Sequence, residues 1–310
     1  NAITLTADYK ERLSYDANGN ILSYLRNGTT AGGGLQTMDN MTYQYFKNTD
    51  GTLRNNRLRM VTDAVAAANY TEDIDDQLAS VSNAADSNYV YDAIGNLIKD
   101  KAEKITNIEW SVYGKILSIT KDAPVNGDVK QITYSYDAAG NRIGKRVEKK
   151  GAQHPASYTW YVRDATGNTM AVYTYEGNNV NSNTLYLTEQ HLYGSSRLGI
   201  WNRNINMDAP LPQGDNVNLL GKGFAANFER GNKFFELSSH LQNVLVTTPD
   251  KKIGVDADNN GQIDYYTADV ITANDYAPFG SLLPGRNYNA PGARDARYGF
   301  NGKENDNEVK

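Results

Sequence analysis

The chain has 310 residues, no cysteine, and a formal net charge of -5 from 36 acidic and 31 basic residues. The lack of cysteine excludes disulfides, thiol catalysis and cysteine-ligated metals. The charge is spread along the chain, so we expect no nucleic-acid partner, which would require a basic stripe. The 22 tyrosines far outnumber the 7 phenylalanines and 3 tryptophans, as is typical of half-exposed sheet faces.

A six-residue phrase, Tyr-Asp-x-x-Gly-Asn, recurs along the chain. It stands at residues 15–20, 91–96 and 136–141, with a weaker copy at 163–168. In each copy Asp opens a turn and Gly takes the positive φ that the turn needs, which predicts a β-hairpin. Catalytic or ligand roles for Asp16, Asp92 and Asp137 are the less favoured alternative. Recurrence predicts a stack of similar units, each too small to bury a core alone.

Before the second copy, the chain is predicted to form strands interrupted by turns. We expect turns at residues 16–19, 29–34 and 48–51. An alanine-containing stretch follows at 62–85, and within it residues 63–68 are predicted to form a short helix.

The middle of the chain holds the two clearest repeats, at residues 87–147. Between them a degenerate unit at 110–119 keeps the aromatic-turn-Gly order without the Asp. Beyond residue 157 the spacing widens, with a predicted hairpin from 157–162 to 170–175. Further predicted features are a loop at 177–182, strands at 184–194 and 196–201, an insertion at 202–223, and strands at 234–237 and 243–248. No linker forces a domain boundary, so the simplest expectation is one continuous all-β segment over residues 1–310.

One loop has the residues of a calcium site. The candidate ligands, in a D-x-D-x-N-G-x-I-D pattern, are Asp256, Asp258, Asn260, Gln262 and Asp264. Carboxylate, amide and carbonyl oxygens at these spacings suit Ca²⁺, and Ile263 is expected to point inward and anchor the loop. Position 12 is Thr267 where a bidentate Glu is usual, and Asp269 lies two residues farther on. Bound calcium would be structural; the alternative is a polar turn between strands at 252–255 and 265–267.

Signatures of enzymes are not found in the sequence. It has no G-x-S-x-G, no phosphate-binding G-x-x-x-x-G-K-[ST] and no H-E-x-x-H, and His154, His191 and His240 lie far apart. We interpret the histidines as structural and the protein as non-enzymatic. No apolar run is long enough to span a membrane and no signal peptide is seen, so the sequence is expected to be a processed product or an excerpt.

Four motifs together resemble the RHS or YD-repeat proteins of bacteria. They are the Tyr-Asp-x-x-Gly-Asn copies, Glu-Leu-Ser-Ser-His-Leu-Gln-Asn-Val at 236–244, Asn-Asp-Tyr-Ala-Pro-Phe-Gly at 274–280, and Arg-Tyr-Gly-Phe-Asn-Gly-Lys-Glu-Asn-Asp at 297–306. The last two resemble the approach to the RHS-associated core domain. The family usually has Gly where this chain has Gln242, so that turn is expected to be altered. The self-cleaving segment of the family lies beyond Lys310.

The resemblance implies a hollow β-shell of stacked antiparallel hairpins that encloses a polypeptide, often a C-terminal toxin. We therefore expect a secreted or surface scaffold whose partners are a cargo or toxin polypeptide and other shell segments. The alternative is a cell-surface adhesion or carbohydrate-binding module that binds surface glycans. A shell predicts that Tyr91, Tyr136 and Trp160 pack between neighbouring hairpins, whereas a binding module predicts that they gather on one exposed patch.

Overall fold

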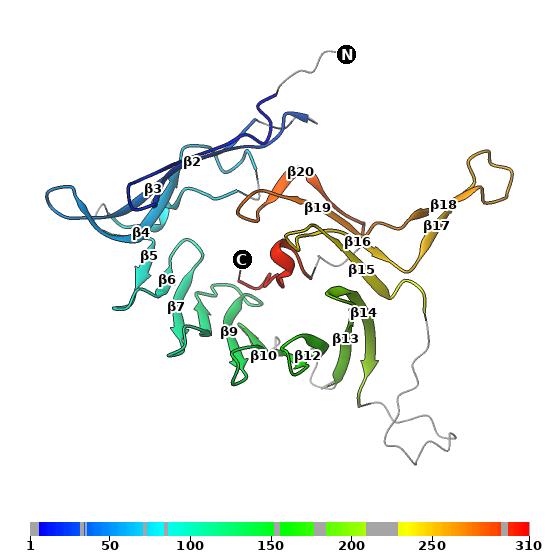
Figure 1. Cartoon of the computed structure of the whole chain (residues 1–310). Helices are drawn as coiled ribbons and strands as arrows, with labels where there is room; N and C mark the ends of the chain where they lie inside the picture. The colour runs from blue at the N-terminus through cyan, green and yellow to red at the C-terminus, as the bar shows by residue number, and fades with distance from the viewer. Residues whose placement is uncertain are drawn as a thin grey trace. The chain divides into compact units, whose positions relative to one another are not determined.

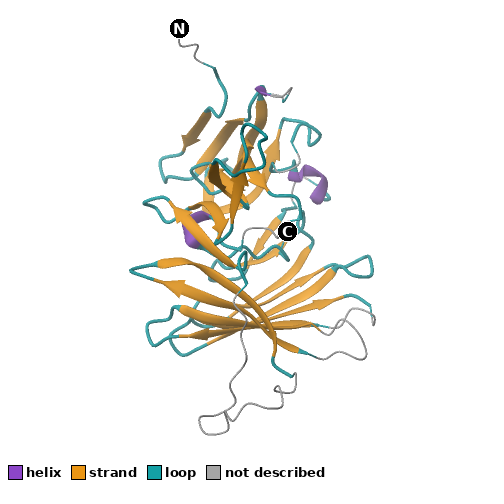
Figure 2. Ribbon diagram, turned by 90° about the vertical axis from the view of Figure 1, so that its right-hand side faces the viewer, coloured by secondary structure: helices purple, strands orange, loops and turns teal. Residues whose placement is uncertain are grey.

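The computed structural model is built almost entirely of β-strands (Figure 2), as the sequence predicts. It describes residues 6–31, 34, 36–70, 73–83, 86–151, 156–176, 184–208, 229–292 and 297–309. Neighbouring strands pair antiparallel, which confirms the all-β class. The chain divides into two compact units, described separately below: unit 1 is Asn1–Pro124 with Ser281–Arg286, and unit 2 is Val125–Gly280 with Asn287–Lys310.

Unit 1 begins with a four-stranded antiparallel sheet. Its strands lie in chain order: β1 (Glu11–Tyr15), β2 (Ile21–Asn27), β3 (Thr37–Lys47) and β4 (Leu53–Asp63). Alternation along these strands buries Tyr24, Met41 and Val61 together as a small core. The short 3-10 helix η2 (Gln77–Ser80) follows, and then the strands β5 (Tyr89–Tyr91), β6 (Leu97–Asp100), β7 (Ile105–Trp110) and β8 (Ile116–Lys121).

The helix predicted at residues 63–68 is wrong. Strand β4 continues to Asp63, which pairs with Met41 of β3, and turns and bends follow. The Asp63 carboxylate accepts hydrogen bonds from the backbone amides of Asn40 (2.7 Å) and Val65 (3.2 Å). An aspartate that binds nearby amides competes with helix formation, and sheet pairing overrides the weak propensity of the alanines.

Unit 2 is dominated by consecutive antiparallel strands (Figure 1). They are β9 (Val129–Tyr136), β10 (Arg142–Lys149), β11 (Ser157–Arg163), β12 (Thr169–Glu176), β13 (Leu185–Tyr193), β14 (Arg197–Asn206), β15 (Lys233–Ser238), β16 (Val244–Pro249) and β19 (Thr272–Tyr276). A separate hairpin of β17 (Lys252–Val255) and β18 (Tyr265–Ala268) projects from this unit (Figure 1). Strand β20 (Leu282–Asn289) straddles the division, and the 3-10 turn η3 (Phe300–Gly302) lies near the C-terminus.

Each Tyr-Asp-x-x-Gly-Asn copy forms the predicted hairpin turn. In the copy at 136–141, the Gly140 amide donates to the Asp137 carbonyl (3.0 Å), and Gly140 has φ +80°. The Asn141 side chain donates to Asp137 Oδ2 (3.0 Å) while its backbone amide donates to Oδ1 (2.8 Å). Asn96 and Asn168 bond Asp92 and Asp164 in the same way. The Asn that ends the phrase therefore holds the turn closed, a role that the sequence analysis missed.

Two departures from the phrase keep the same turn. In the degenerate unit, Ser111 replaces Asp, and its hydroxyl accepts the Lys115 amide (3.0 Å). At residues 239–243, the amide of Gln242 donates to the Ser239 carbonyl (2.9 Å), and Gln242 has φ +65°. The expected alteration of that turn is therefore not seen: Gln adopts a left-handed conformation that usually favours Gly.

The connection predicted at 202–223 begins too early. Residues 202–206 continue β14, and Leu187 of β13 pairs with Ile205. Residues 209–223, most of the proposed insertion, lie outside the described residues, as do the loop at 177–182 and His154.

Candidate functional site

One face of the unit 2 sheet, here the inner face, is lined by buried side chains. On β9, β10 and β11 it carries Tyr134, Lys145 and Tyr161, with Ile132 and Val147 beside them. The pairing of β9 with β10 sets Tyr134 opposite Lys145 and Ile132 opposite Val147. Because residues two apart point to the same side of a strand, the alternation in these strands gives one buried face. A lysine on such a face is unusual and needs charged partners.

Those partners come from residues 297–308, here called the strap. Its three acids, Glu304, Asp306 and Glu308, stand at alternate positions and are partly buried, whereas Asn305 and Asn307 between them are exposed. An isolated bridge joins Tyr298 to Glu304, and the Asn305 amide donates to the Arg297 carbonyl (2.9 Å). Residues 304–306 run extended beside 297–298, so Glu304 and Asp306 point to the same side. A turn follows, in which the Val309 amide donates to the Asp306 carbonyl (3.1 Å), and Glu308 reaches Lys145 from this turn.

Lys145 is the centre of the contact between strap and sheet. Its Nζ lies 3.1 Å from Asp306 Oδ1 and 2.9 Å from Glu308 Oε1. On the same strand, Arg142 Nη1 lies 2.9 Å from Asp306 Oδ2 and 3.9 Å from Glu304 Oε2. Two cations of β10 therefore face three carboxylates of the strap, and the ammonium of Lys145, 8% exposed, is satisfied by two of them.

Two tyrosine hydroxyls complete the contact. Tyr161 donates to Glu304 Oε1 (2.9 Å), and Tyr134 donates to Asp306 Oδ2 (3.3 Å). Burial, followed by the charge of the facing acid, raises the pKa of each phenol above its ordinary value. Both hydroxyls therefore stay protonated and act as donors to the carboxylates.

The pKa of Asp306 is lowered in spite of burial. Burial alone would raise it, but the charges of Arg142 and Lys145 outweigh that effect. The ionised form is therefore the one that this site stabilises.

A second polar cluster lies at the start of the strap. Arg297 Nε is 3.2 Å from Glu189 Oε2, and Arg297 Nη2 is 3.0 Å from Glu304 Oε1. The Tyr298 ring meets His191 edge-on at 5.7 Å between centroids, and the Arg197 guanidinium carbon lies 3.5 Å from the centroid of the Tyr298 ring. His191 is thus buried beside the strap, consistent with the structural role predicted for it.

Between the strap and the sheet lies a cavity of about 480 Å³. Its walls combine apolar side chains such as Ile200 and Phe234 with Lys145, Glu236 and Arg297. Glu236 is paired with Arg197 at 2.9 Å. The charged groups that line this cavity are therefore mostly the same ones that hold the strap.

The predicted calcium loop connects β17 and β18, the two strands that were predicted to flank it. Carboxylate oxygens of Asp256, Asp258 and Asp264 lie within 4.8 Å of one another. The amides of Gly261 (2.7 Å) and Asn260 (3.1 Å) donate to Asp256, whose pKa is lowered chiefly by the bond from Gly261. Oxygen donors thus gather where Ca²⁺ was predicted, and backbone amides already serve several of them.

The other predicted members of that loop are arranged less favourably. The side chain of Asn260 accepts the amide of Gln262 (2.8 Å). Asp269 lies 3.9 Å from Lys251, so its carboxylate has a partner outside the loop. Ile263, which was expected to point inward and anchor the loop, contacts Gly254 of β17 but remains 56% exposed. A lone two-stranded hairpin has no core into which an anchor could point.

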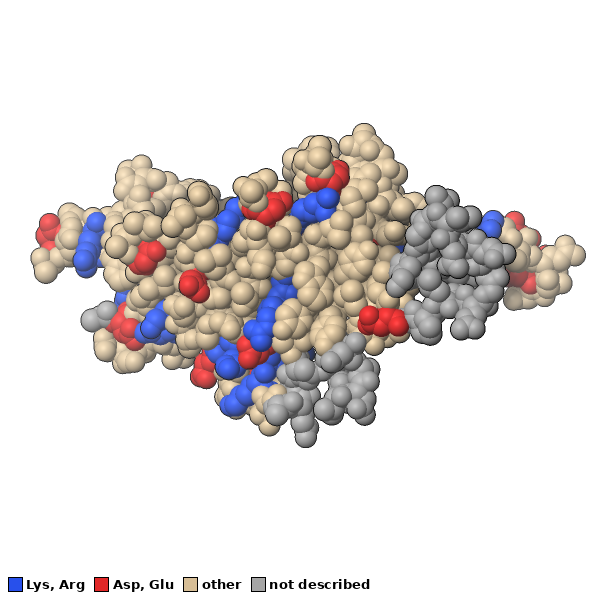
Figure 3. Space-filling view, turned by 90° about the horizontal axis from the view of Figure 1, so that it is seen from below, with Lys and Arg blue, Asp and Glu red and all other residues tan. Residues whose placement is uncertain are grey.

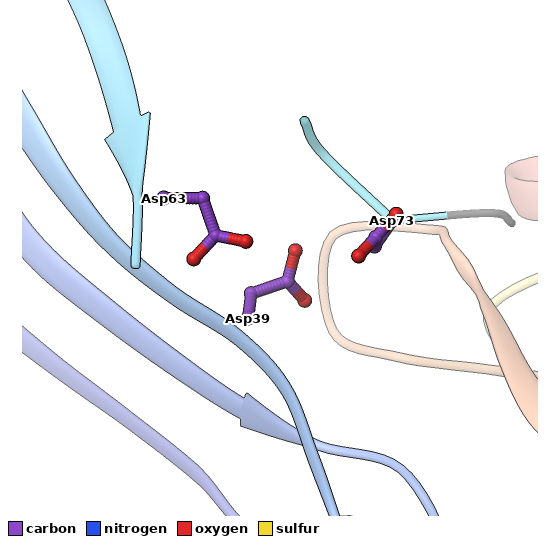
Figure 4. A group of neighbouring side chains, drawn as sticks. All are labelled: Asp39, Asp63 and Asp73. Carbon is purple, nitrogen blue, oxygen red and sulfur yellow. The ribbon is translucent and has the colours of Figure 1, made fainter. Parts of the chain in front are cut away.

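A second group of acids, absent from the sequence analysis, occurs in unit 1. Carboxylate oxygens of Asp39, Asp63 and Asp73 lie within 4.8 Å of one another (Figure 4). Asp39 is fully buried and receives Arg26 Nε at 2.6 Å and the Ile74 amide at 3.2 Å. Burial and the nearby charge of Asp39 raise the pKa of Asp73. Arg26 and backbone amides already bind the carboxylates of Asp39 and Asp63, so we assign no bound metal or other ligand to this group.

Aromatic rings in both units are covered by cationic side chains. Tyr91 donates its hydroxyl to the carbonyl of Leu58 on β4 (2.9 Å), with Arg57 over its ring at 5.8 Å. Trp160 stacks on Tyr158 with 5.5 Å between centroids and 7° between planes, yet remains 41% exposed. Further covered rings are Tyr24, Tyr134, Tyr158, Tyr161, Trp201 and Tyr266. Much of the aromatic surface is therefore engaged in packing rather than open as a platform.

The comparisons with known proteins give no family. No protein-family model matches the chain, and no curated protein matches it. Among solved structures, it is similar to TcdB2-TccC3 without its hypervariable C-terminal region, with 15% identity, a TM-score of 0.45, and coverage of 96% of this chain and 13% of that chain. It is also similar to the TcdB2-TccC3-Cdc42 structure, with 13% identity, a TM-score of 0.40, and coverage of 96% and 15%. The chain thus spans a small part of the length of either protein.

Surface charge and hydropathy add two observations. On the face drawn in Figure 3, acidic and basic side chains are interspersed. Among the described residues, no helix has the length and apolar character needed to cross a membrane.

Proposed function

We propose that this chain is a non-enzymatic scaffold, a segment of a secreted or surface-displayed RHS-repeat shell that encloses or presents a polypeptide such as a C-terminal toxin. The observation that carries the proposal is the strap. Lys145, Arg142 and two tyrosine hydroxyls of the inner face bind a segment of polypeptide without regular secondary structure through its acids. A sheet that holds such a segment by polar contacts has the chemistry that an enclosing shell requires.

The repeated hairpins supply the mechanical part of this role. Each turn is closed by its own Asp and Asn, as in the pair Asp137 and Asn141, so neighbouring strands are joined with little loop between them. Consecutive pairing leaves few free strand edges within each sheet, and free edges are where unwanted association begins.

The alternative of an adhesion or carbohydrate-binding module has less support. Sugars stack on open aromatic faces, but cations lie over the rings of Tyr91 and Trp201, and Trp160 shares one face with Tyr158. The partial exposure of Trp160 is the feature that keeps this alternative testable.

Electron microscopy of the chain within its natural full-length protein tests the proposal. We expect a closed cavity with polypeptide density inside it. An open sheet whose inner face meets solvent would contradict the proposal. Binding to a glycan array that is lost on Trp160→Ala would instead favour the adhesion module. The matched control is Trp110→Ala, because the Trp110 indole already donates to the Leu97 carbonyl (2.8 Å).

A further inference from the structure

The inner face of β9–β11 recognises the strap through charge and spacing together. Glu304, Asp306 and Glu308 are each separated from the next by a single residue, and every one of them meets a cation or hydroxyl of the sheet. Asn305 and Asn307 are exposed. The charged and hydroxyl groups of the surface therefore meet the acids at positions 304, 306 and 308, two of them on the extended run and the third on the turn that follows.

The receiving groups are positioned by contacts within the sheet as well as by the strap. Lys145 is held in β10 by pairing with β9 and β11, opposite Tyr134 and Thr159. Arg142 lies over the Tyr134 ring, with 4.4 Å from its guanidinium carbon to the ring centroid. Preorganised donors lose little entropy on binding, so a matching acidic segment gains most of the interaction energy.

Apolar packing is concentrated in the first part of the strap. Tyr298 packs with the buried Ile200 and Val244, and the Phe300 ring lies 5.8 Å from that of Tyr276 between centroids. The part of the strap that carries the acids is bound mainly by ion pairs and hydroxyl donors. Such a contact is selected by the pattern of charges rather than by the shape of an apolar side chain.

We propose that the surface formed by Tyr134, Arg142, Lys145 and Tyr161 is a binding site for acidic polypeptide with carboxylates at alternate sequence positions, and that the strap occupies this site in the folded chain. The partner is defined by its chemistry: a segment of the form acid-x-acid-x-acid. The strap is then a built-in competitor that must leave before another such segment can bind. This inference concerns the surface itself and goes beyond the role of the chain in a shell.

The test uses a strap-released variant of the full chain, with Glu304→Gln, Asp306→Asn and Glu308→Gln combined. Release is followed by trypsin cleavage after Lys303. Binding is followed by the fluorescence anisotropy of a labelled peptide of residues 301–310. We expect the released variant to bind this peptide at least about tenfold more tightly than the unaltered chain, because charged hydrogen bonds become available again.

Three matched comparisons separate recognition from general charge attraction. Adding Lys145→Gln to the released variant is expected to weaken binding about tenfold or more. Arg146→Gln alters the same charge on the same strand, but Arg146 bonds Glu148 (3.0 Å) and Tyr158 (3.1 Å) away from the strap, so binding should persist. A peptide of the same composition with its three acids consecutive should bind about tenfold more weakly.

Three results would overturn the proposal. The first is a variant that trypsin cleaves after Lys303 but that does not bind the peptide. The second is equal binding of the alternate and consecutive peptides, which would indicate simple charge attraction. The third is unchanged protection of Lys303, which would show that the acids do not hold the strap. If the triple variant fails to fold, Asp306→Asn alone should give intermediate cleavage and binding; no change in either would contradict the proposal.

Discussion

Two sets of three acids differ in what faces them. The strap acids meet Arg142 and Lys145 of the inner face, and the pKa of Asp306 is lowered. In the aspartate group of unit 1, Arg26 pairs with Asp39, and burial and the negative charge of Asp39 raise the pKa of Asp73. Identical chemical groups are thus stabilised as anions in one unit and crowded in the other. The arrangement of cations, rather than the number of acids, decides the role of each set.

The largest effect is expected from removing Lys145, the cation at the centre of the strap contact. Lys145→Gln should lower the free energy of unfolding of unit 2 by about 3 kcal/mol, because two partly buried carboxylates lose their partner. Urea unfolding followed by circular dichroism measures the change. Arg146→Gln, on the other face of β10, should cost less than about 0.5 kcal/mol. Equal losses of unfolding free energy for the two variants would show that the pairing of Lys145 with the strap acids stabilises the unit no more than an exposed ion pair does.

Lowering the pH should remove the stabilisation that the ionised strap acids provide, without any substitution. The folded pKa of Asp306 lies below its unfolded value, so its stabilisation is full above the unfolded pKa of about 3.9 and is lost as the pH falls through the folded pKa. Hydrogen exchange of the Asn305 amide, corrected for intrinsic exchange at each pH, should show protection at neutral pH and a loss below about pH 4. Asp306→Asn should weaken that pH dependence, and an unchanged profile in this variant would argue against Asp306 as the titrating group.

The unit 1 group should respond in the opposite direction to neutralisation. Asp73→Asn is expected to raise the free energy of unfolding at pH 7 by about 0.5 kcal/mol, a value kept small because solvent screens a partly exposed carboxylate. The sign follows from the raised pKa of Asp73, which means that the folded state disfavours its charge. Thermal melting measures the change. Destabilisation by this variant would mean that the charge is used by a partner or ligand.

The acids of the β17–β18 loop extend the comparison to a third set, which has no cation of its own. We predict that millimolar Ca²⁺ supplies one and raises the melting temperature of the hairpin, with little effect on the rest of the unit. Asp258→Ala should abolish the rise, because Asp258 is one of the clustered carboxylates. The matched control is Asp250→Ala, outside the loop. Identical melts with calcium and with chelator would leave the loop as a polar turn.

The fold was more predictable from sequence than the site. The Tyr-Asp-x-x-Gly-Asn phrase specifies its hairpin within six residues, since the Asp and Asn side chains and the positive φ of Gly all act locally. The helix at 63–68 failed because pairing of Asp63 with Met41 across two strands decides that segment, and such pairing is not encoded locally.

The strap contact depends on residues far apart in the chain. Lys145 and Asp306 are separated by 161 positions, so no local pattern could join them. One signal was present: acids at 304, 306 and 308 alternate with asparagine, which predicts an extended segment with a charged side. What the sequence could not supply was the basic surface on the other side, since nothing in the stretch Arg-Ile-Gly-Lys-Arg at 142–146 tells which of its cations face the strap.

The extended run of the strap from Glu304 to Asp306 also makes its placement sensitive to chain length. Successive residues of an extended chain advance by about 3.3 Å and point to opposite sides. Deleting Asn305 would therefore turn either Glu304 or Asp306 away from its partners on the inner face, and a shift by a single residue would bring an asparagine to Lys145 in place of a carboxylate. The number of residues between these two acids, and not only their charge, thus fixes where the strap lies.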